Sequence, residues 1–418
     1  MLQNDDLKER LSALYALIDW VSRGTMIREH SLSPFAKELA LGVCRRHLRL
    51  LHAIKKNVHR MPGTEVACVL ELGIYQLFYM DSVPSRAAVD SSAELARRAS
   101  LGEGSVKLVN AVLRSLESAG LPELPKQNVQ RISLEYSMPE WLVRRLLDSY
   151  GSEVTEEFAK ESVERPSQWI RANVEKISAQ DLQAKLGVQG RIYKDRYLEI
   201  PESAELTPRL GELLKSESFE KGLFSVQNPA AFEVVELLDV KENSFVWDAC
   251  AAPGGKSALI AEGFPKARIL ASDSSEERLC PMDDLTKRLG LSNVQVQRID
   301  ALNSGFVDKF DRILLDVPCS NMGVLSRRPE VKYRLTPDDF KELPKIQYEI
   351  LDKASAALGL GGILVYATCS PERAETDKVV KKFLENHLDF EMVGDPMRIG
   401  KNEFGLDHFF AASLRRKQ

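Results

Sequence analysis

The sequence lacks any long apolar segment. No run among its 418 residues approaches the roughly 18 apolar residues that a bilayer-spanning helix needs. The opening residues, Met1-Leu2-Gln3-Asn4-Asp5-Asp6, are acidic and polar, unlike a secretory signal. The 6 cysteines show no paired spacing, which indicates free thiols in a reducing compartment. We therefore expect a cytoplasmic protein without a membrane span.

An excess of positive charge is also missing. The chain carries 57 Lys and Arg against 61 Asp and Glu, for a net charge of -4, which argues weakly against a nucleic-acid ligand. One stripe, residues 45–60, nevertheless contains Lys, Arg and His residues and no acidic residue. Such a stripe can neutralise phosphates. A solvated helix face is the more common explanation, and on the stripe alone we favour it.

The glycine patterns of two common nucleotide-binding loops are absent as well. The segment Asp248–Ser257 reads Asp-Ala-Cys-Ala-Ala-Pro-Gly-Gly-Lys-Ser. It does not have the G-x-G-x-x-G spacing of dinucleotide sites, and it lacks the first glycine of a Walker loop. Its small residues still allow the backbone to turn tightly and to approach a ligand closely. A dinucleotide or a nucleoside triphosphate is therefore disfavoured as the ligand.

Helical periodicity dominates residues 1–125. Near the start, apolar residues recur at helical spacing, at Leu7, Leu11, Leu14, Leu17 and Ile18. Further helices are predicted at residues 33–58, 65–80, 86–99 and 104–118. The segment 121–125, with two prolines in five residues, ends the helical region and is typical of a linker.

Residues 130–225 mix short helices and strands. Strands are predicted at residues 169–174, 191–193 and 197–200. Ser178 is expected to cap the helix between them, with Asp181 in the reciprocal position. We expect a small α+β module here.

Strands alternate with helices from about residue 226 onward. The strand candidates are the apolar runs at residues 245–247, 268–271, 294–296, 312–315 and 363–366. This alternation is the signature of a doubly wound, largely parallel α/β sheet. Residues 390–393 and 408–412 are expected to close the sheet with an antiparallel hairpin.

Three acidic residues are placed to hold a ligand. Asp273, Asp300 and Asp316 are expected to end three consecutive strands. Ligands of open α/β sheets bind at this edge, where carboxylates can bind ribose hydroxyls or an adenine amino group. A single strand-end acid is ordinarily the N-cap of the next helix. Three of them beside a loop of small residues favour an adenosine-type ligand.

Two cysteines follow buried strands and should therefore emerge at the same edge. Cys319 and Cys369 each come directly after an apolar run, and Asp316 lies three residues before the first of them. Two thiols and an acid at a ligand-binding edge indicate covalent chemistry. A zinc site formed by the four cysteines between residues 250 and 369 would lack paired ligand spacing, so no metal is expected. A disulfide between Cys319 and Cys369 is disfavoured in a reducing compartment.

The other thiols have structural explanations. Cys44 and Cys68 lie in apolar helical surroundings and are expected in a hydrophobic core. Cys280 is expected to pack on a helix, and Cys250 lines the small-residue loop without needing to react.

At three places the sequence resembles the RNA 5-methylcytosine methyltransferases of the NOL/NOP2/Sun family, which use S-adenosylmethionine. These places are Asp248–Ser257, Asp316–Ser320 and Thr368–Ser370. In addition, Phe224–Ala230 looks like the family's opening segment and Gly323–Lys332 looks like its basic loop. The motifs occur in the family's order, which argues against a chance match.

The first domain resembles a particular branch of this family. Pro84–Asp90 and Lys107–Arg114 are similar to the helical NusB-like domain of the bacterial RsmB (Sun, Fmu) enzymes, which modify 16S ribosomal RNA. The resemblance implies an all-helical NusB-like RNA-binding domain at residues 1–125 and a small α+β linker module at 130–225. It implies a Rossmann-like, S-adenosylmethionine-dependent methyltransferase domain at 226–418.

The resemblance also implies roles for the site residues. Cys369 is implied to attack carbon 6 of a cytosine, and Cys319 is implied to act when the product is released. Asp316 can stabilise the protonated N3 of the base, and nearby Lys256 can favour the ionised thiol. The residues expected to bind the cofactor are Cys250, Ala251, Ala252, Pro253, Gly254, Gly255, Lys256, Asp273, Arg278, Asp300 and Asp316.

The expected function is therefore methylation of carbon 5 of a cytosine in 16S rRNA through a covalent cysteine adduct. The expected substrate is the rRNA or an early small-subunit assembly intermediate, and the expected oligomeric state is a monomer. A non-catalytic RNA-binding assembly factor is the alternative function. A third hypothesis is a DNA cytosine-5 methyltransferase, in which the cysteine of a Pro-Cys motif is the nucleophile; the second cysteine, Cys369, favours the RNA class.

Three segments depart from the pattern of the family. Asn321-Met322 follows Pro-Cys-Ser where a small residue and Thr are usual. Glu375-Thr376-Asp377 stands in place of Glu-Asn-Glu, and His408 stands in place of Gly before two phenylalanines. Every side chain with an implied catalytic role is nevertheless in place.

Overall fold

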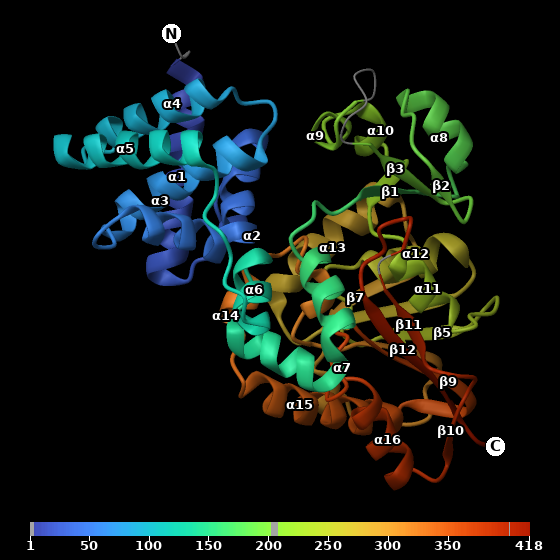
Figure 1. Cartoon of the computed structure of the whole chain (residues 1–418). Coiled ribbons are helices and arrows are strands. Elements are labelled where there is room, and N and C mark those ends of the chain that lie inside the picture. Colours follow the sequence, from blue (N-terminus) through green and yellow to red (C-terminus); the bar gives the residue numbers. More distant parts are fainter. Residues whose placement is uncertain (1–3, 202–207, 401) are drawn as a thin grey trace. The chain divides into compact units, whose positions relative to one another are not determined.

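The computed structural model describes residues 4–201, 208–400 and 402–418. It divides into two compact units (Figure 1). The first consists of Met1–Arg165 together with Leu325–Leu335, and the second consists of Pro166–Val324 together with Thr336–Gln418. Within the described residues, no helix is long and apolar enough to cross a membrane.

The first unit is helical, as predicted. All four helices predicted between residues 33 and 118 are confirmed to within about two residues at each end. Ser33 begins the first of them, because its hydroxyl accepts a hydrogen bond of 3.2 Å from the backbone N–H of Ala36. The helices of this unit are α1 (Asn4–Arg23), α2 (Pro34–Asn57), α3 (Thr64–Tyr79), α4 (Ser85–Arg98), α5 (Glu103–Ala119), α6 (Asn128–Glu135), α7 (Glu140–Glu161) and α14 (Val331–Arg334).

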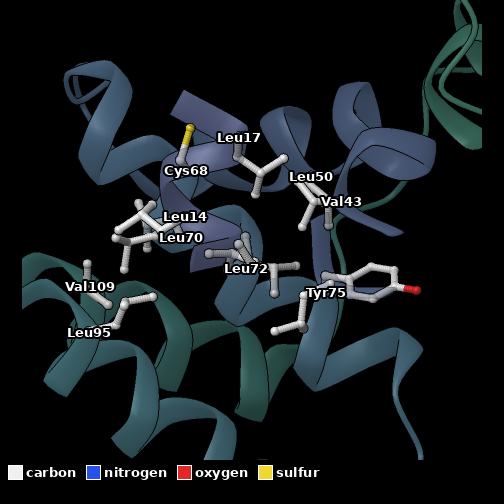
Figure 2. Close-up of a cluster of buried hydrophobic side chains, with 14 of the residues drawn as sticks. Leu14, Leu17, Val43, Leu50, Cys68, Leu70, Leu72, Tyr75, Leu95 and Val109 are labelled. Atoms are coloured by element: carbon white, nitrogen blue, oxygen red, sulfur yellow. The ribbon is translucent and has the colours of Figure 1, made fainter. Parts of the chain in front are cut away.

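One hydrophobic core joins the first five helices (Figure 2). It takes Leu14 and Leu17 from α1, which were part of the helical repeat noted in the sequence, and both are fully buried. Cys44 and Cys68 lie in this core, as predicted. Burial raises the pKa of both thiols, so neither is reactive near neutral pH. The other labelled members in Figure 2 are Val43, Leu50, Leu70, Leu72, Tyr75, Leu95 and Val109.

The basic stripe of residues 45–60 is only partly the solvated face that we favoured. Arg45 is buried, and Arg46 and Arg49 are half-buried along α2. Arg46 donates to the carbonyl oxygen of Glu135 at 3.4 Å, and Arg49 donates to that of Pro122 at 2.8 Å. Only the last part of the stripe, around Lys55 and Lys56, is exposed. The arginines instead hold neighbouring segments of the same unit against α2. The periodicity of the sequence within α2 could not reveal these contacts with distant residues.

A short segment from late in the sequence, Leu325–Leu335, folds with the first unit; we call it the inserted segment. Its Lys332 is fully buried and donates to the carbonyl oxygens of Arg45 at 3.1 Å and Tyr136 at 3.3 Å. The hydroxyl of Tyr333 donates to the carbonyl of Ser137 at 2.9 Å. The family resemblance placed Lys332 in a basic loop, but here its ammonium group is satisfied inside a protein unit.

Lys332 should make the stability of the first unit depend on pH. Burial lowers the pKa of its ammonium group from 10.5 to about 7. Between these values the unfolded chain binds more protons at this group than the folded one, so Lys332 should make the free energy of unfolding rise from pH 7 to pH 8, below the pH at which the buried thiols of Cys44 and Cys68 begin to oppose it. We expect the unfolding transition of this unit in the full chain, followed by calorimetry, to gain stability over this range. Lys332→Met should lose that gain, whereas exposed Lys55→Met should keep it; equal slopes in both variants would contradict the prediction.

The second unit contains two sheets. The smaller has the order β2-β3-β1-β4 and is antiparallel throughout. Its three predicted strands are confirmed, and Ser178 caps α8 by accepting from the N–H of Asp181 at 3.0 Å. Asp181 does not bind back to the backbone as predicted, since its carboxylate accepts from the Ser178 hydroxyl. The elements are β1 (Gln168–Ala172), α8 (Ala179–Leu186), β2 (Ile192–Tyr193), β3 (Tyr197–Ile200), α9 (Leu210–Leu213), α10 (Glu217–Glu220) and β4 (Phe224–Val226).

The larger sheet confirms the predicted α/β domain. Its order is β10-β12-β9-β8-β5-β6-β7, with β11 also paired to β12. The five predicted strands β5 to β9 are mutually parallel, and β12 is antiparallel to β9. The strands are β5 (Phe245–Asp248), β6 (Arg268–Asp273), β7 (Val294–Arg298), β8 (Phe310–Asp316), β9 (Leu358–Thr368), β10 (Phe390–Met392), β11 (Met397–Ile399) and β12 (Phe409–Arg416). The closing strands are antiparallel as predicted, but β11 lies between them in sequence, so they do not form a simple hairpin.

Helices cover both faces of this sheet. Successive residues of β9 face opposite sides: Leu364 and Tyr366 join one core cluster, and Val365 joins the other. The first cluster includes α15 (Asp339–Ser355) and α16 (Asp377–Asn386), and the second includes α11 (Ala230–Glu236) and α12 (Gly255–Gly263). Burial on both faces explains why the strands are continuous apolar runs in the sequence.

The strand order creates a switch point between β5 and β8. From β5 the chain continues to β6 on one side, whereas β8 lies on the other side. In open α/β sheets the ligand binds at the carboxyl ends of the strands at such a point. The strand ends that meet there are Asp248 of β5 and Asp316 of β8.

Candidate functional site

The loop after β5 brings the backbone close to any ligand at the switch point. Gly254 has a φ of 96°, which only glycine adopts readily, and a Cβ atom there would lie 3.1 Å from the side chain of Met282. Asp248, at the end of β5, is almost fully buried and accepts from the Ser257 hydroxyl at 2.6 Å. Burial raises the pKa of Asp248 to about 7, although the hydrogen bond from Ser257 works in the opposite direction.

A buried arginine from the smaller sheet supports this loop. Arg171 of β1 is fully buried and makes two hydrogen bonds to Glu262 of α12, of 2.9 and 2.8 Å. Its Nη1 also donates to the carbonyl oxygen of Gly255 at 3.0 Å. The small sheet therefore fixes the first turn of α12, where the ligand loop ends. Sequence reasoning missed Arg171, because an arginine inside a predicted strand is ordinarily solvent-exposed.

Asp273 and Asp300 are two of the acids expected to bind the ligand. Only Asp273 lies at the end of its strand. Asp273 ends β6 as predicted, and its Oδ1 accepts from the N–H of Ser275 at 3.1 Å. Its Oδ2 is buried and accepts no hydrogen bond from the described residues, while Arg278 Nη2 lies 3.4 Å away. Asp300 does not end β7, which stops at Arg298; its Oδ1 accepts from the N–H of Leu302 at 3.0 Å. The N-cap role that the sequence left open for such acids therefore applies to Asp300.

Lys256 and Asp316 form an ion pair at the switch point. Lys256 Nζ lies 2.5 Å from Asp316 Oδ2 and 5.0 Å from the centre of the Phe409 ring. Burial lowers the pKa of Lys256, but the carboxylates of Asp316 and Asp248 more than offset this, so the pKa is raised. Lys256 is therefore charged. The other oxygen of Asp316, Oδ1, accepts no hydrogen bond from the described residues, so it is available to a ligand.

The two cysteines singled out in the sequence lie side by side. The Sγ atoms of Cys319 and Cys369 are 3.1 Å apart. The hydrogen bond with Cys369, together with burial and the charge of Glu375, raises the pKa of Cys319 well above its usual value. Cys319 therefore keeps its proton and is the donor in this pair. A thiol that donates to a neighbouring sulfur stabilises negative charge on that sulfur.

Asn321, the first residue that departs from the family pattern, contacts both cysteine segments. Its φ is 58°, a left-handed conformation that asparagine tolerates better than most residues. Its amide nitrogen donates to the carbonyl oxygen of Cys319 at 2.8 Å, and its Oδ1 accepts from Cys369 Sγ at 3.3 Å. The orientation of the amide follows from the first bond, because the carbonyl of Cys319 can only accept. Asn321 therefore restrains the Cys369 side chain rather than reaching outward.

Comparison with known proteins agrees with this geometry. Residues 235–408 match the family model of the 16S rRNA methyltransferase RsmB/F, residues 5–118 match the NusB family, and residues 138–198 match the RsmF/B-like ferredoxin-like domain. The chain is 33% identical over 409 residues to the probable ribosomal RNA small subunit methyltransferase B of Bacillus subtilis, covering 91% of this chain and 90% of that protein. The chain belongs to the RsmB/F methyltransferase family.

Solved structures show the same fold for this RsmB/F family member. The crystal structure of PH0851 covers 99% of both chains with a TM-score of 0.79 at 22% identity. The structure of NSun6 from Pyrococcus horikoshii with SFG, an analogue of S-adenosylmethionine, covers 67% of this chain and 98% of its own, with a TM-score of 0.59 and 23% identity. The predicted arrangement of a NusB-like helical part, a small ferredoxin-like part and a Rossmann-like methyltransferase part is confirmed, and the cofactor is S-adenosylmethionine.

The residues of this RsmB/F chain fit the cofactor. The buried Oδ2 of Asp273 needs a hydrogen-bond donor, and a ribose hydroxyl would supply one. The loop Cys250–Gly255 contains only small residues and one proline, and Gly254 has the left-handed conformation that lets the backbone turn there. Cys250 itself is inert, since burial raises the pKa of its thiol. The role of each residue in this loop, and of Asp300, remains a prediction.

Asp273→Ala should weaken cofactor binding. The variant removes the predicted acceptor for the ribose hydroxyls, and a hydrogen bond to a charged group contributes about 1.5–3 kcal/mol. We therefore expect the Kd for S-adenosylmethionine, measured by calorimetry, to rise about 10- to 100-fold. Asp284→Ala, an exposed position in the next helix, α13 (Glu276–Leu289), is the matched control and should leave the Kd unchanged. An unchanged Kd in Asp273→Ala would rule out this role.

Proposed function

We propose that the protein methylates carbon 5 of a cytosine in 16S rRNA, with Cys369 as the attacking thiolate. The observation that supports this best is the 3.1 Å separation of the Cys319 and Cys369 sulfurs beside the Lys256–Asp316 pair. One catalytic thiol is enough for attack alone. Two adjacent thiols suit a reaction in which a sulfur must first bind the base and then leave it.

The attack requires Cys369 to be ionised, so its sulfur must first give up the proton that it donates to Asn321 Oδ1. Cys319 has a raised pKa and donates to the Cys369 sulfur, which supports this assignment. The cation of Lys256 also favours negative charge on that sulfur. The Cys369 sulfur adds to carbon 6, and the electron pair of the C5–C6 double bond makes carbon 5 nucleophilic. S-adenosylmethionine, when bound, supplies the electrophilic methyl group.

Asp316 is proposed to bind the Watson–Crick edge of the base. Its Oδ1 is available, and its Oδ2 is held by Lys256. A carboxyl group at N3 stabilises the positive charge that develops there as sulfur adds to carbon 6. Contact with the exocyclic amine would select cytosine over uracil, because a buried acceptor left without a donor is costly. The base must also leave any stack to reach this site.

Release is proposed to depend on Cys319. A base must take the C5 proton; the electrons of that C–H bond then form the C5–C6 double bond, and the Cys369 sulfur leaves with its bonding pair. Cys319 lies next to the departing sulfur and is proposed to act as, or through, this base. The presence of a second thiol beside the Pro-Cys cysteine favours this scheme over that of DNA cytosine-5 methyltransferases, in which the Pro-Cys cysteine attacks.

Incubation with labelled S-adenosylmethionine and naked 16S rRNA tests the proposal directly. We expect label in 5-methylcytosine, and bisulfite sequencing of rRNA from cells lacking the protein should show which cytosine loses its methyl group. The same rRNA within an early assembly intermediate of the small subunit is the second substrate to test. RNA binding without cytosine methylation of either substrate, at any salt concentration, would instead support the non-catalytic assembly factor.

A further inference from the structure

A fully buried carboxylate lies between the two cysteine segments. Glu375 belongs to neither of them, following β9 by several residues, and its side chain has no exposed surface. Burying a carboxylate is costly unless its oxygens are fully hydrogen-bonded. The partners that satisfy Glu375 therefore indicate what the carboxylate is for.

Those partners come from both cysteine segments. Ser320, which follows Cys319, donates to Glu375 through its backbone N–H at 2.8 Å and through its hydroxyl at 2.5 Å. Ser370, which follows Cys369, donates through its hydroxyl at 2.7 Å. Both hydroxyls bind the same oxygen, Oε1. One carboxylate thus ties together the residues that directly follow the two thiols.

The Glu375 carboxylate is itself held in place. Gln347 of α15 donates to Glu375 Oε2 at 3.0 Å and to the carbonyl oxygen of Pro318 at 2.9 Å. The hydroxyl of Tyr366 donates to the backbone carbonyl of Glu375 at 2.6 Å. Such a network, with each member satisfied, is rigid and fixes the groups bound to it. The Pro318–Ser320 segment is therefore held at both ends.

We infer that Glu375 is a positioning residue that sets the separation between the sulfurs of Cys319 and Cys369. This inference rests on the proposed function, in which both thiols act on one base. A positioning role explains why a carboxylate is buried here: holding the two cysteine segments together offsets the free energy lost by desolvating it. Position matters because a displacement of about 1 Å in a reacting group can lower a rate about 100-fold.

A trivalent arsenical, phenylarsine oxide, tests the separation without RNA or cofactor. It binds tightly only where two thiols can reach one arsenic atom, so its affinity reports how the two sulfurs are pre-arranged. We expect tight binding to the full-length protein and about 10- to 100-fold weaker binding to Glu375→Ala, because loosening the segments removes the advantage of pre-organisation. Single-site alkylation by iodoacetamide should still label Cys369 in that variant.

Glu375→Gln separates geometry from charge. The amide oxygen can replace Oε2 and accept from Ser320 N–H and Gln347, while the amide nitrogen can donate to the hydroxyls of Ser320 and Ser370 after these rotate. We therefore expect Glu375→Gln to retain arsenical binding within about threefold, a difference of less than 1 kcal/mol. Glu71→Gln, at another almost fully buried acid, controls for a general loss of stability and should leave arsenical binding unchanged.

Two outcomes would overturn the inference. One is equal arsenical affinity in wild type and Glu375→Ala. The other is an equal loss in Glu71→Gln, which would show that stability alone is being measured. If the proposed function is correct, Glu375→Ala should also lower kcat while leaving the KM for S-adenosylmethionine unchanged. If no cytosine is methylated by the wild-type protein, the arsenical result still decides the positioning role.

Discussion

Replacing Cys319 by alanine should yield a protein that remains covalently attached to its RNA. In Cys319→Ala the Cys369 sulfur can still add to carbon 6, and the methyl group can still be transferred. The step that breaks the carbon–sulfur bond should then fail, because the group next to the departing sulfur is missing. We expect a covalent protein–RNA species that survives denaturing electrophoresis. This species should accumulate only when S-adenosylmethionine is present.

Replacing Cys369 by alanine should have the opposite result. No adduct can form, and methylation should fall by roughly 10⁴-fold or more, the scale seen when the nucleophile of a covalent enzyme is removed. Cys280→Ser is the matched control: Cys280 lies on α13, as expected, but is exposed rather than packed, and it contacts neither cysteine. An adduct in Cys369→Ala and none in Cys319→Ala would reverse the two roles and favour the chemistry of DNA cytosine-5 methyltransferases.

Asp316→Asn should lower kcat by about 10²- to 10³-fold, the usual effect of removing one group that stabilises transition-state charge. The amide retains the shape of the carboxylate but not the charge that faces N3. The variant should also lose stability, because it leaves the half-buried ammonium group of Lys256 without its nearest counter-ion. Leaving one member of a fully buried pair unpaired typically costs about 3–5 kcal/mol, and this half-buried pair should cost less because water screens the remaining charge.

The double variant Asp316→Asn/Lys256→Met separates these two effects. Removing both charges should restore much of the stability, measured by urea unfolding, because no unpaired charge remains buried. The activity should not return. Glu242→Gln, which breaks the exposed pair with Lys266, is the matched control and should change neither quantity appreciably. Recovery of activity in the double variant would show that Asp316 serves only to neutralise Lys256.

The parallel sheet, and the position of Cys319 and Cys369 at its edge, could be predicted because the sequence patterns that indicate them are local. Each buried strand is an apolar run of its own, and the residue that follows it must lie at the sheet edge. The end of β7 could not be predicted as well. Its valines alternate with exposed glutamines, so the strand is not a continuous apolar run with a clear last residue. The sequence therefore predicts a strand end at Asp300, two residues beyond the observed end at Arg298.

The supporting residues of the site could not be predicted, because their roles depend on contacts between distant residues. Glu375 and Ser320 are separated by 55 positions, and Arg171 and Glu262 by 91. In the sequence Glu375 is the first residue of the segment that stands in place of Glu-Asn-Glu, but no spacing rule shows whether its side chain is buried or solvated. A buried, hydrogen-bonded carboxylate becomes recognisable only when the partners that satisfy it are placed.

The inserted segment has a consequence for dissecting the molecule. Because Leu325–Leu335 folds with the first unit, the polypeptide passes between the units at residues 165–166, 324–325 and 335–336. A protease that nicks the chain once near Arg165 therefore leaves the two parts tethered by two further crossings. An isolated fragment 166–418 would expose the ring of Tyr333 and strip Lys332 of its carbonyl partners. Neither unit is a contiguous stretch of sequence, and an excised catalytic fragment is expected to be poorly soluble unless residues 325–335 are replaced by a polar linker.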